Sequence, residues 1–191
     1  MKKEHIYTIV FMFIVSGVFT LFLAASNAYY LPVIKKNAEL SRNKSILSAF
    51  GIESKDGSLG KAIEMVKVNG TEIYVKRNED NTIEAYAVPF TGSGLWGSIS
   101  GYLAVSSDFA KIVGVDFTSH SETPGLGGRI DEKWFKEQFR GLSIDKGKPL
   151  VYKAGSEGDV DAITGATSTS KSVLQILNNV IESDLSRLEV K

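Results

Sequence analysis

The sequence predicts an α+β protein in which an antiparallel sheet packs with helices to form one domain, preceded by a single N-terminal transmembrane helix. Three observations support this fold class: an uncharged apolar run near the N-terminus, five short segments with a two-residue period, and an amphipathic segment near the C-terminus. Short connections between the alternating segments favour antiparallel pairing. We therefore expect a tail and membrane helix over residues 1–31, a stalk helix and linker over 32–60, and the folded domain over 61–191.

The apolar run extends from Ile6 to Leu31 and contains no charged residue. At about 1.5 Å per residue it can cross a hydrocarbon core of roughly 30 Å. A cleaved signal peptide is the alternative, because the chain has a basic start and residues 26–28 (Ser-Asn-Ala) resemble a cleavage site. The apolar part exceeds the roughly 7 to 15 residues of a signal peptide core, and Tyr29 and Tyr30 fit an interfacial anchor. We therefore favour a membrane span.

The remaining elements follow from periodicity and turn residues. Pro32 is expected to interrupt or kink the helix that leaves the membrane, residues 34–50 predict a stalk helix, and the glycine-containing residues 51–60 predict a linker. Asn69-Gly70 fits a hairpin turn. Strands are predicted over 62–68, 72–76, 82–88, 98–106 and 111–117, helices over 132–140 and 173–188, and a return to the sheet over 150–153.

The composition excludes several classes of function. Lysine plus arginine and aspartate plus glutamate each number 22 in a chain of 191 residues, so no excess of positive charge indicates nucleic acid as a partner. Without cysteine the chain has no disulfide, no thiol nucleophile and no cysteine ligand for iron and sulfur. His5 and His120 lie too far apart to suggest a metal pair. Any redox chemistry therefore needs a bound cofactor.

A hydroxyl-rich turn from Asp161 to Ser170 runs directly into the C-terminal amphipathic segment. Free amides and the helix dipole favour an anion at such a position, and Gly165 and Ala166 leave the backbone bare enough for a phosphate to approach. The alternative is plain helix capping, because Ser and Thr are common at helix N-termini. The residues alone leave both interpretations open.

Two glycine-containing loops interrupt the predicted sheet. Residues 92–97 (Gly-Ser-Gly-Leu-Trp-Gly) either bring Leu95 and Trp96 to a loop tip or form a tight turn with the tryptophan in the core. Residues 120–127 (His-Ser-Glu-Thr-Pro-Gly-Leu-Gly) either form a plain Pro-Gly turn or carry chemistry. A hydrolytic site with His120 as base and Glu122 as its orienting partner is disfavoured, because residues two apart in a turn rarely face one another and no nucleophile elbow is present. We assign no catalytic residue.

These three stretches resemble a known family, the flavin-carrying G subunits of Rnf complexes and C subunits of sodium-pumping quinone reductases. Asp161 to Ser170 resembles its flavinylation motif: aspartate, two residues, Ser/Thr-Gly-Ala-Thr and a short Ser/Thr run. Gly-Leu-Trp-Gly and His-x-Glu-Thr-Pro-Gly-Leu-Gly resemble its two other motifs, in the same order. The motifs span Gly92 to Ser170, and the membrane anchor matches only in kind. The chain lacks the longer insertions of the C subunits, which favours the Rnf family.

The resemblance implies one covalent FMN per chain, joined by a phosphoester to Thr167. It also implies that the turn around the phosphate and the two loops along the flavin ring contribute the binding residues. These are Thr164, Gly165, Ala166, Ser168 and Thr169 in the turn, and Leu95, Trp96, Glu122, Thr123, Leu126 and Gly127 in the loops.

The same resemblance implies a role in electron relay within an ion-translocating ferredoxin:NAD⁺ oxidoreductase complex. The partners would be other membrane subunits and a flavin transferase that attaches the cofactor. The charges flanking the membrane span do not fix its orientation, so the extracytoplasmic placement of the domain rests on the resemblance. A tethered flavin domain that senses redox state or serves another reductase is the alternative, and a scaffold without flavin is a third possibility.

Overall fold

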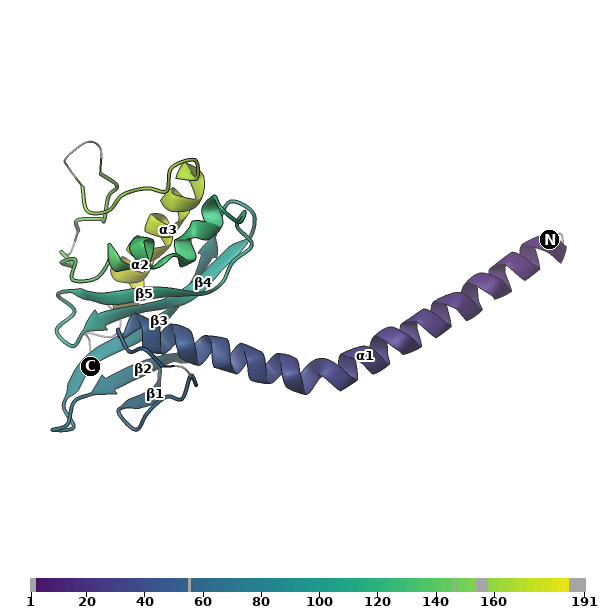
Figure 1. The fold of residues 1–191 in the computed structure, drawn as a ribbon, viewed down its shortest axis with the longest axis horizontal. Coiled ribbons are helices and arrows are strands. Elements are labelled where there is room, and N and C mark those ends of the chain that lie inside the picture. The colour runs from purple at the N-terminus through teal and green to yellow at the C-terminus, as the bar shows by residue number, and fades with distance from the viewer. Residues whose placement is uncertain (1–2, 55, 146, 154–157, 186–191) are drawn as a thin grey trace. The chain divides into compact units, whose positions relative to one another are not determined.

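The computed structural model describes residues 3–54, 56–145, 147–153 and 158–185 (Figure 1). Its internal contacts divide the chain after Glu39 into an N-terminal unit and a unit that begins at Leu40. The first contains most of one long helix, and the second contains the sheet and its covering helices.

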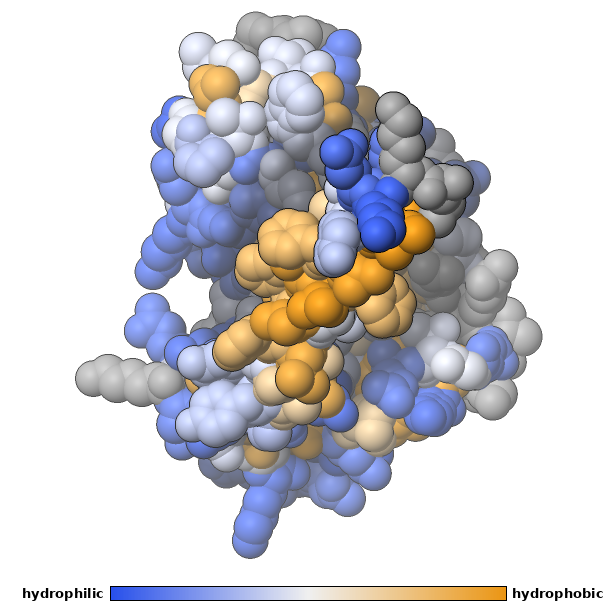
Figure 2. All heavy atoms as spheres, turned by 90° about the vertical axis from the view of Figure 1, so that its right-hand side faces the viewer, coloured by the Kyte–Doolittle hydropathy of each residue, from blue (hydrophilic) through white to orange (hydrophobic). Residues whose placement is uncertain are grey.

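Helix α1 runs from Lys3 to Ala49 and includes the predicted membrane span. Its N-terminal part is long and apolar enough to cross a membrane, and none of that apolar stretch is buried within the chain. Figure 2 shows apolar side chains of this helix as the orange spheres nearest the viewer. Pro32 lies inside the helix rather than between two helices. A proline removes one backbone hydrogen bond, and here the turns on either side continue the helix. The helix is therefore not interrupted at Pro32, and of the two predicted effects only a kink remains.

The sheet is a five-stranded antiparallel meander in the order β1-β2-β3-β4-β5, which confirms the predicted fold class. Each strand pairs with its neighbour in the sequence because short turns connect them. The strands are β1 (Ile63–Val68), β2 (Thr71–Arg77), β3 (Ile83–Ser93), β4 (Ser98–Ser106) and β5 (Ile112–Ser119).

Alternation along the strands gives the sheet two apolar faces. On one face, side chains such as Val88, Phe90 and Leu103 pack with those of α3 (Thr167–Asn179) in the main core. On the other, the smaller side chains of Ala85, Ala87 and Ala104 face Ile46 and Ala49 at the end of α1. The second unit thus has a helix against each face of the sheet.

The segments after β5 differ from their predicted form. A 3₁₀ turn η1 (Gly127–Asp131) precedes a short helix α2 (Lys133–Glu137), whereas one helix over 132–140 was expected. Residues 150–153 do not rejoin the sheet, since only Tyr152 forms an isolated bridge, to Val160. The C-terminal helix changes at Val180 into a π turn, η2 (Val180–Asp184). Positions 186–188 of its predicted extent lie outside the described residues.

Strand β3 is longer than predicted, because it continues through Gly92 and Ser93 opposite Ile99 and Ser98. A Cβ atom at Gly92 would lie 2.3 Å from Cγ1 of Ile176 on α3. The bare glycine therefore allows α3 to approach the end of β3, next to the turn that begins the candidate site.

Candidate functional site

The β3–β4 turn places two large apolar side chains at the surface. The Gly94 amide donates to the Gly97 carbonyl at 2.7 Å, which closes the turn. Leu95 is 54% exposed and Trp96 is 69% exposed. The alternative in which the tryptophan fills the core is therefore wrong. Adjacent exposed apolar side chains of this size are typical of a binding surface.

The backbone amides of the same turn are bound by a distant carboxylate. Leu95 and Trp96 donate their N–H groups to Oε1 of Glu122, at 2.9 and 3.0 Å. Glu122 is only 4% exposed, which is unusual for an acidic side chain. The first two motifs are thus joined by hydrogen bonds beneath the exposed Leu95 and Trp96 side chains.

The loop after β5 is fixed by His120. Its Nδ1 accepts the Glu122 amide at 3.1 Å, and its Nε2 lies 2.8 Å from Oδ2 of Asp131. With Nδ1 as acceptor, Nε2 carries the proton that is donated to Asp131. The Glu122 carboxylate binds other groups, so His120 and Glu122 do not form the pair that a hydrolytic site would need.

The other oxygen of Glu122 reaches the third motif. The hydroxyl of Thr169 donates to Oε2 of Glu122, and Thr169 is almost fully buried. Two glycines leave room for this arrangement. A Cβ at Gly94 would lie 2.5 Å from Oε1 of Glu122, and one at Gly127 would lie 2.5 Å from Oγ1 of Thr169. Glu122 therefore connects all three sequence motifs at one point.

The start of α3 has the features of an anion site. The N-cap residue is Ala166, and no side chain caps the helix. Two nearby hydroxyls bind other groups, since Thr169 donates to Glu122 and Ser170 accepts the Ile163 amide at 3.0 Å, and Thr167 is exposed. Plain capping is therefore not what the structure shows. The first-turn amides have no side-chain acceptor and can bind a phosphate.

The turn before α3 is shaped by Gly165 and held by one residue that sequence reasoning missed, Tyr152. Gly165 has φ +80°, and a Cβ there would lie 3.3 Å from Cδ2 of Leu126, which brings the loop after β5 beside the turn. Tyr152 donates its hydroxyl to the Ser170 carbonyl at 2.5 Å. Burial raises the pKa of Tyr152. The only signal in the sequence for the contact between Tyr152 and Ser170 is a hydroxyl-bearing side chain within an otherwise apolar segment.

The remaining predicted residues lie around this centre. Thr164 and Ser168 are exposed beside Thr167, and Leu126 is exposed next to Gly165. Thr123 shapes its loop through its carbonyl, which accepts the amides of Leu126 at 3.1 Å and Gly128 at 2.9 Å. Among the described residues no cluster that could hold a metal ion is found. The structure thus combines an uncapped helix start, an exposed hydroxyl and exposed apolar side chains at one end of the sheet.

This site lies within a recognised domain. Residues 94–182 match the family model of the FMN-binding domain. The chain is 32% identical over 120 residues to the C subunit of the Na⁺-translocating NADH-quinone reductase of Yersinia pestis, with 59% of this chain and 45% of that protein covered. It is 34% identical over 116 residues to the G subunit of the proton-translocating ferredoxin:NAD⁺ oxidoreductase complex of Clostridium ljungdahlii. This alignment covers 61% of this chain and 62% of that protein. The chain thus spans about half the length of the quinone reductase proteins.

Two solved structures share the fold. The C subunit of the Na⁺-translocating NADH-quinone reductase from Parabacteroides distasonis superposes with a TM-score of 0.64 at 25% identity, covering 82% of this chain and 95% of that one. NqrC of Shewanella oneidensis gives a TM-score of 0.57 at 28% identity, covering 70% of this chain and 71% of that one. The predicted relation to the G subunits of ferredoxin:NAD⁺ oxidoreductase complexes and the C subunits of Na⁺-translocating quinone reductases is confirmed.

The residues present fit an FMN group. A phosphate matches the uncapped amides at the start of α3, beside an exposed Thr167 hydroxyl. A flat apolar ring matches the exposed side chains of Leu95, Trp96 and Leu126.

Proposed function

We propose that this chain carries one FMN, covalently bound through its phosphate to Thr167, and that it relays electrons within an ion-translocating ferredoxin:NAD⁺ oxidoreductase complex of the Rnf type. The observation that carries the proposal is the junction at Glu122, where the attachment turn and both loops meet. The resemblance of the motifs and the match to the FMN-binding domain support the choice of cofactor.

The attachment end is formed by the first turn of α3. Thr167 is the acceptor that the motif resemblance implies, and its exposed side chain agrees with this role, whereas the Thr169 hydroxyl is buried against Glu122. The first-turn amides and the helix dipole stabilise the negative charge of a phosphoester. Thr164, Gly165, Ala166 and Ser168 form the surrounding turn. A covalent bond also prevents loss of the cofactor by dilution at a water-exposed surface.

The ring end is formed by the two loops. Leu95, Trp96 and Leu126 supply an apolar surface, and Thr123 and Gly127 shape the loop that carries Leu126. The bound FMN supplies electron-transfer chemistry, and the protein sets its potential by burial, stacking and nearby charge. Glu122 fixes the Leu95 and Trp96 backbone and places a carboxylate beneath this surface.

The setting follows from α1 and the relatives. We propose that residues 6–31 span the cell membrane and that the domain lies on its extracytoplasmic side. Other membrane subunits would donate and accept the electrons, and a flavin transferase would attach the FMN. The Clostridium relative is aligned over 62% of its length, against 45% for the Yersinia relative, which supports the Rnf type.

A second candidate is the role of the C subunit in a Na⁺-translocating NADH:quinone reductase, which both solved structures favour. Co-purification separates the two, because ferredoxin:NAD⁺ oxidoreductase subunits support the first and quinone reductase subunits the second. Isolation without either would indicate a tethered sensor or a carrier for another reductase.

Intact-mass measurement tests the cofactor. The full chain, co-expressed with a flavin transferase, should gain the mass of one FMN less one water, and the Thr167→Ala variant should not. Parent chain that stays unmodified beside a transferase-positive control would support a scaffold without flavin.

A further inference from the structure

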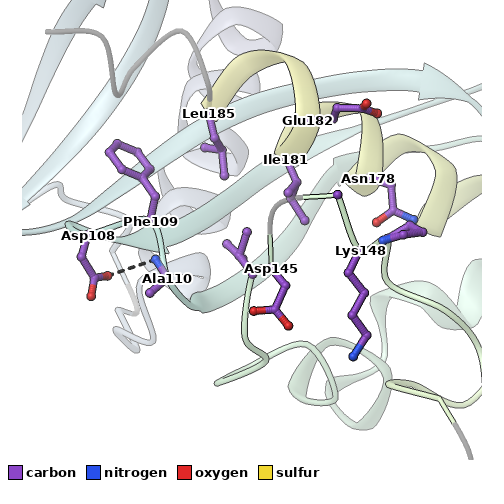
Figure 3. A pocket seen from close by; sticks show the side chains of 12 residues that line it. Asp108, Phe109, Ala110, Asp145, Lys148, Asn178, Ile181, Glu182 and Leu185 are labelled. Atoms are coloured by element: carbon purple, nitrogen blue, oxygen red, sulfur yellow. Dashed lines mark hydrogen bonds between the residues drawn. The ribbon is translucent and has the colours of Figure 1, made fainter.

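A second concave site lies away from the three motifs. A cavity of about 600 Å³ opens between the β4–β5 turn, the segment around Ile144 and the turn η2 (Figure 3). Its apolar lining comes from Phe109, Ile144, Ile181 and Leu185. Binding pockets commonly measure roughly 300 to 1,000 Å³. This cavity is therefore large enough for a few side chains of a partner.

One wall of the cavity has an unfavourable backbone conformation. Phe109 has φ +57°, which is a rare conformation for a bulky residue. The turn is held by the Phe109 amide, which donates to the Ser106 carbonyl at 2.9 Å. The Phe109 ring stacks on Tyr86 with centroids 5.2 Å apart. Such strain persists where the surroundings enforce it, and it is frequent at binding sites.

The opposite wall is also irregular. Ile181 and Glu182 belong to the π turn η2, and Leu185 follows it directly. Figure 3 shows the side chains of Ile181 and Leu185 pointing from this part of the chain into the space between the β4–β5 turn and Asp145. Single π turns are rare and often occur at functional sites. Two unusual backbone features therefore border the same cavity.

The charged side chains that line the cavity are mostly acidic among the described residues. Asp108, Asp145 and Glu182 line it, against the single lysine Lys148 among the described lining residues. The Ser106 hydroxyl and then the Ala110 amide hold the pKa of Asp108 below its usual value, so this carboxylate is ionised at neutral pH. An apolar floor with an acidic rim complements an apolar group that lies beside a cation.

The cavity lies at the opposite end of the sheet from the flavin site. The Leu95–Trp96 turn precedes β4, and the turn that carries Phe109 follows it. Nine residues of strand separate the two ends, which corresponds to roughly 26 Å at about 3.3 Å per step. A partner bound at the cavity would leave the flavin end of the domain uncovered.

From these observations we propose that the cavity docks a partner-subunit segment that presents a large apolar side chain beside a lysine or arginine. The choice of a partner subunit as the occupant, and the need to keep the other end of the sheet accessible, rest on the proposed function. The docking site itself stands on the cavity, its two irregular walls and its charge.

Methyl NMR of the full chain in nonionic detergent tests the proposal, with labelled Ile and Leu and two short peptides as probes. Acetyl-Lys-Leu-Phe-Lys-amide should shift the methyl signals of Ile144, Ile181 and Leu185 saturably. Acetyl-Glu-Leu-Phe-Glu-amide should bind more weakly, by a factor of up to about five. An exposed ion pair changes a dissociation constant by at most about this factor. Equal affinities, or shifts centred on Leu126 and Ile176, would overturn the proposal.

Asp145→Lys should abolish the preference for the basic peptide. Glu79→Lys, which makes the same charge change at the exposed β2–β3 turn, should retain it. The Thr167→Ala variant should bind as the parent does, whether or not the parent carries flavin, so failure of the docking site and failure of the proposed function are distinguishable. Loss of the preference in Glu79→Lys would show that only net charge is measured and would refute docking at the cavity.

Discussion

The Thr169 hydroxyl donates a hydrogen bond to Glu122, although 47 residues separate them in the sequence. Because the other oxygen of Glu122 accepts the Leu95 and Trp96 amides, the start of α3 and the β3–β4 turn share one buried acceptor. The proposed attachment residue, Thr167, lies two positions before Thr169 on the same helix. The position of an attached phosphate is therefore linked to that of the apolar side chains meant for the ring.

Thr169→Val should destabilise the domain by about 1 to 3 kcal/mol, because a buried carboxylate oxygen then loses its donor without a change in side-chain shape. Urea denaturation of unmodified protein measures the effect. Thr167→Val is the matched control, and at this exposed position the change should stay within about 0.5 kcal/mol. Similar losses in both variants would show that the Glu122 contact contributes nothing to stability.

Thr167→Ala should remove the flavin fluorescence that remains after denaturing electrophoresis, because it removes the proposed acceptor oxygen. Thr167→Ser keeps a hydroxyl and should retain at least partial modification. Thr164→Ala, at another exposed threonine of the turn, should remain fluorescent. A fluorescent Thr167→Ala band would transfer the attachment to Thr164 or Thr169.

The sheet could be predicted because its signal is local. Alternation along each strand and short turns define a meander, and both are visible in the sequence. The strand predicted over 82–88 stops before Pro89, whereas β3 continues through this proline to Ser93, although proline is rare in strand interiors. In the structure β2 pairs with β3 only as far as Ala87, so Pro89 pairs with β4 at Tyr102 on the other side, beyond the last β2 partner. Its missing N–H therefore costs no ladder bond to β2.

The site was predicted only as separate motifs. The residue types of the three stretches indicated their importance, but the bond between Thr169 and Glu122 depends on how α3 packs over the sheet. Local periodicity contains no information on that distance. Glu122 was accordingly expected as a ring contact, whereas the structure buries it as a shared acceptor for two amides and a hydroxyl.

Leu177→Ala should destabilise the domain by about 2 to 5 kcal/mol, because Leu177 is fully buried between α3 and the sheet. Gln175→Ala is the matched control on the exposed side of the same helix and should change stability little. Chemical denaturation of both variants measures the difference. A parental midpoint for Leu177→Ala would show that this helix face is not part of the stabilising core.

Stability should fall in strong alkali. Burial raises the pKa of Tyr152, and it raises that of Tyr102 to about 12, from the usual value of about 10. The folded state holds these protons more tightly than the unfolded state, so stability is unaffected below about pH 10 and decreases as the pH rises above it. Tyr152→Phe should lose less stability than the parent between pH 8 and about pH 11, as urea midpoints at the two pH values would show. An equal loss in parent and variant would mean that Tyr152 is not the group responsible.

The last prediction separates the ring end of the site from the phosphate end. Glu122→Gln and Leu126→Ala should both leave attachment at Thr167 intact, because the attachment turn is unchanged in sequence. Glu122→Gln should nevertheless raise the flavin midpoint potential, since a carboxylate near the ring disfavours the more electron-rich reduced form. Glutamine can still accept the Leu95 and Trp96 amides, which limits disturbance of the turn.

Leu126→Ala should shift the potential or the absorption spectrum by exposing the ring to water. Lys171→Ala, at an exposed position on the first turns of α3, should leave the potential nearly unaltered. Redox titration of the flavinylated full chain measures all three, and a shift in Lys171→Ala with parental values in the loop variants would mean that the ring and phosphate ends are reversed.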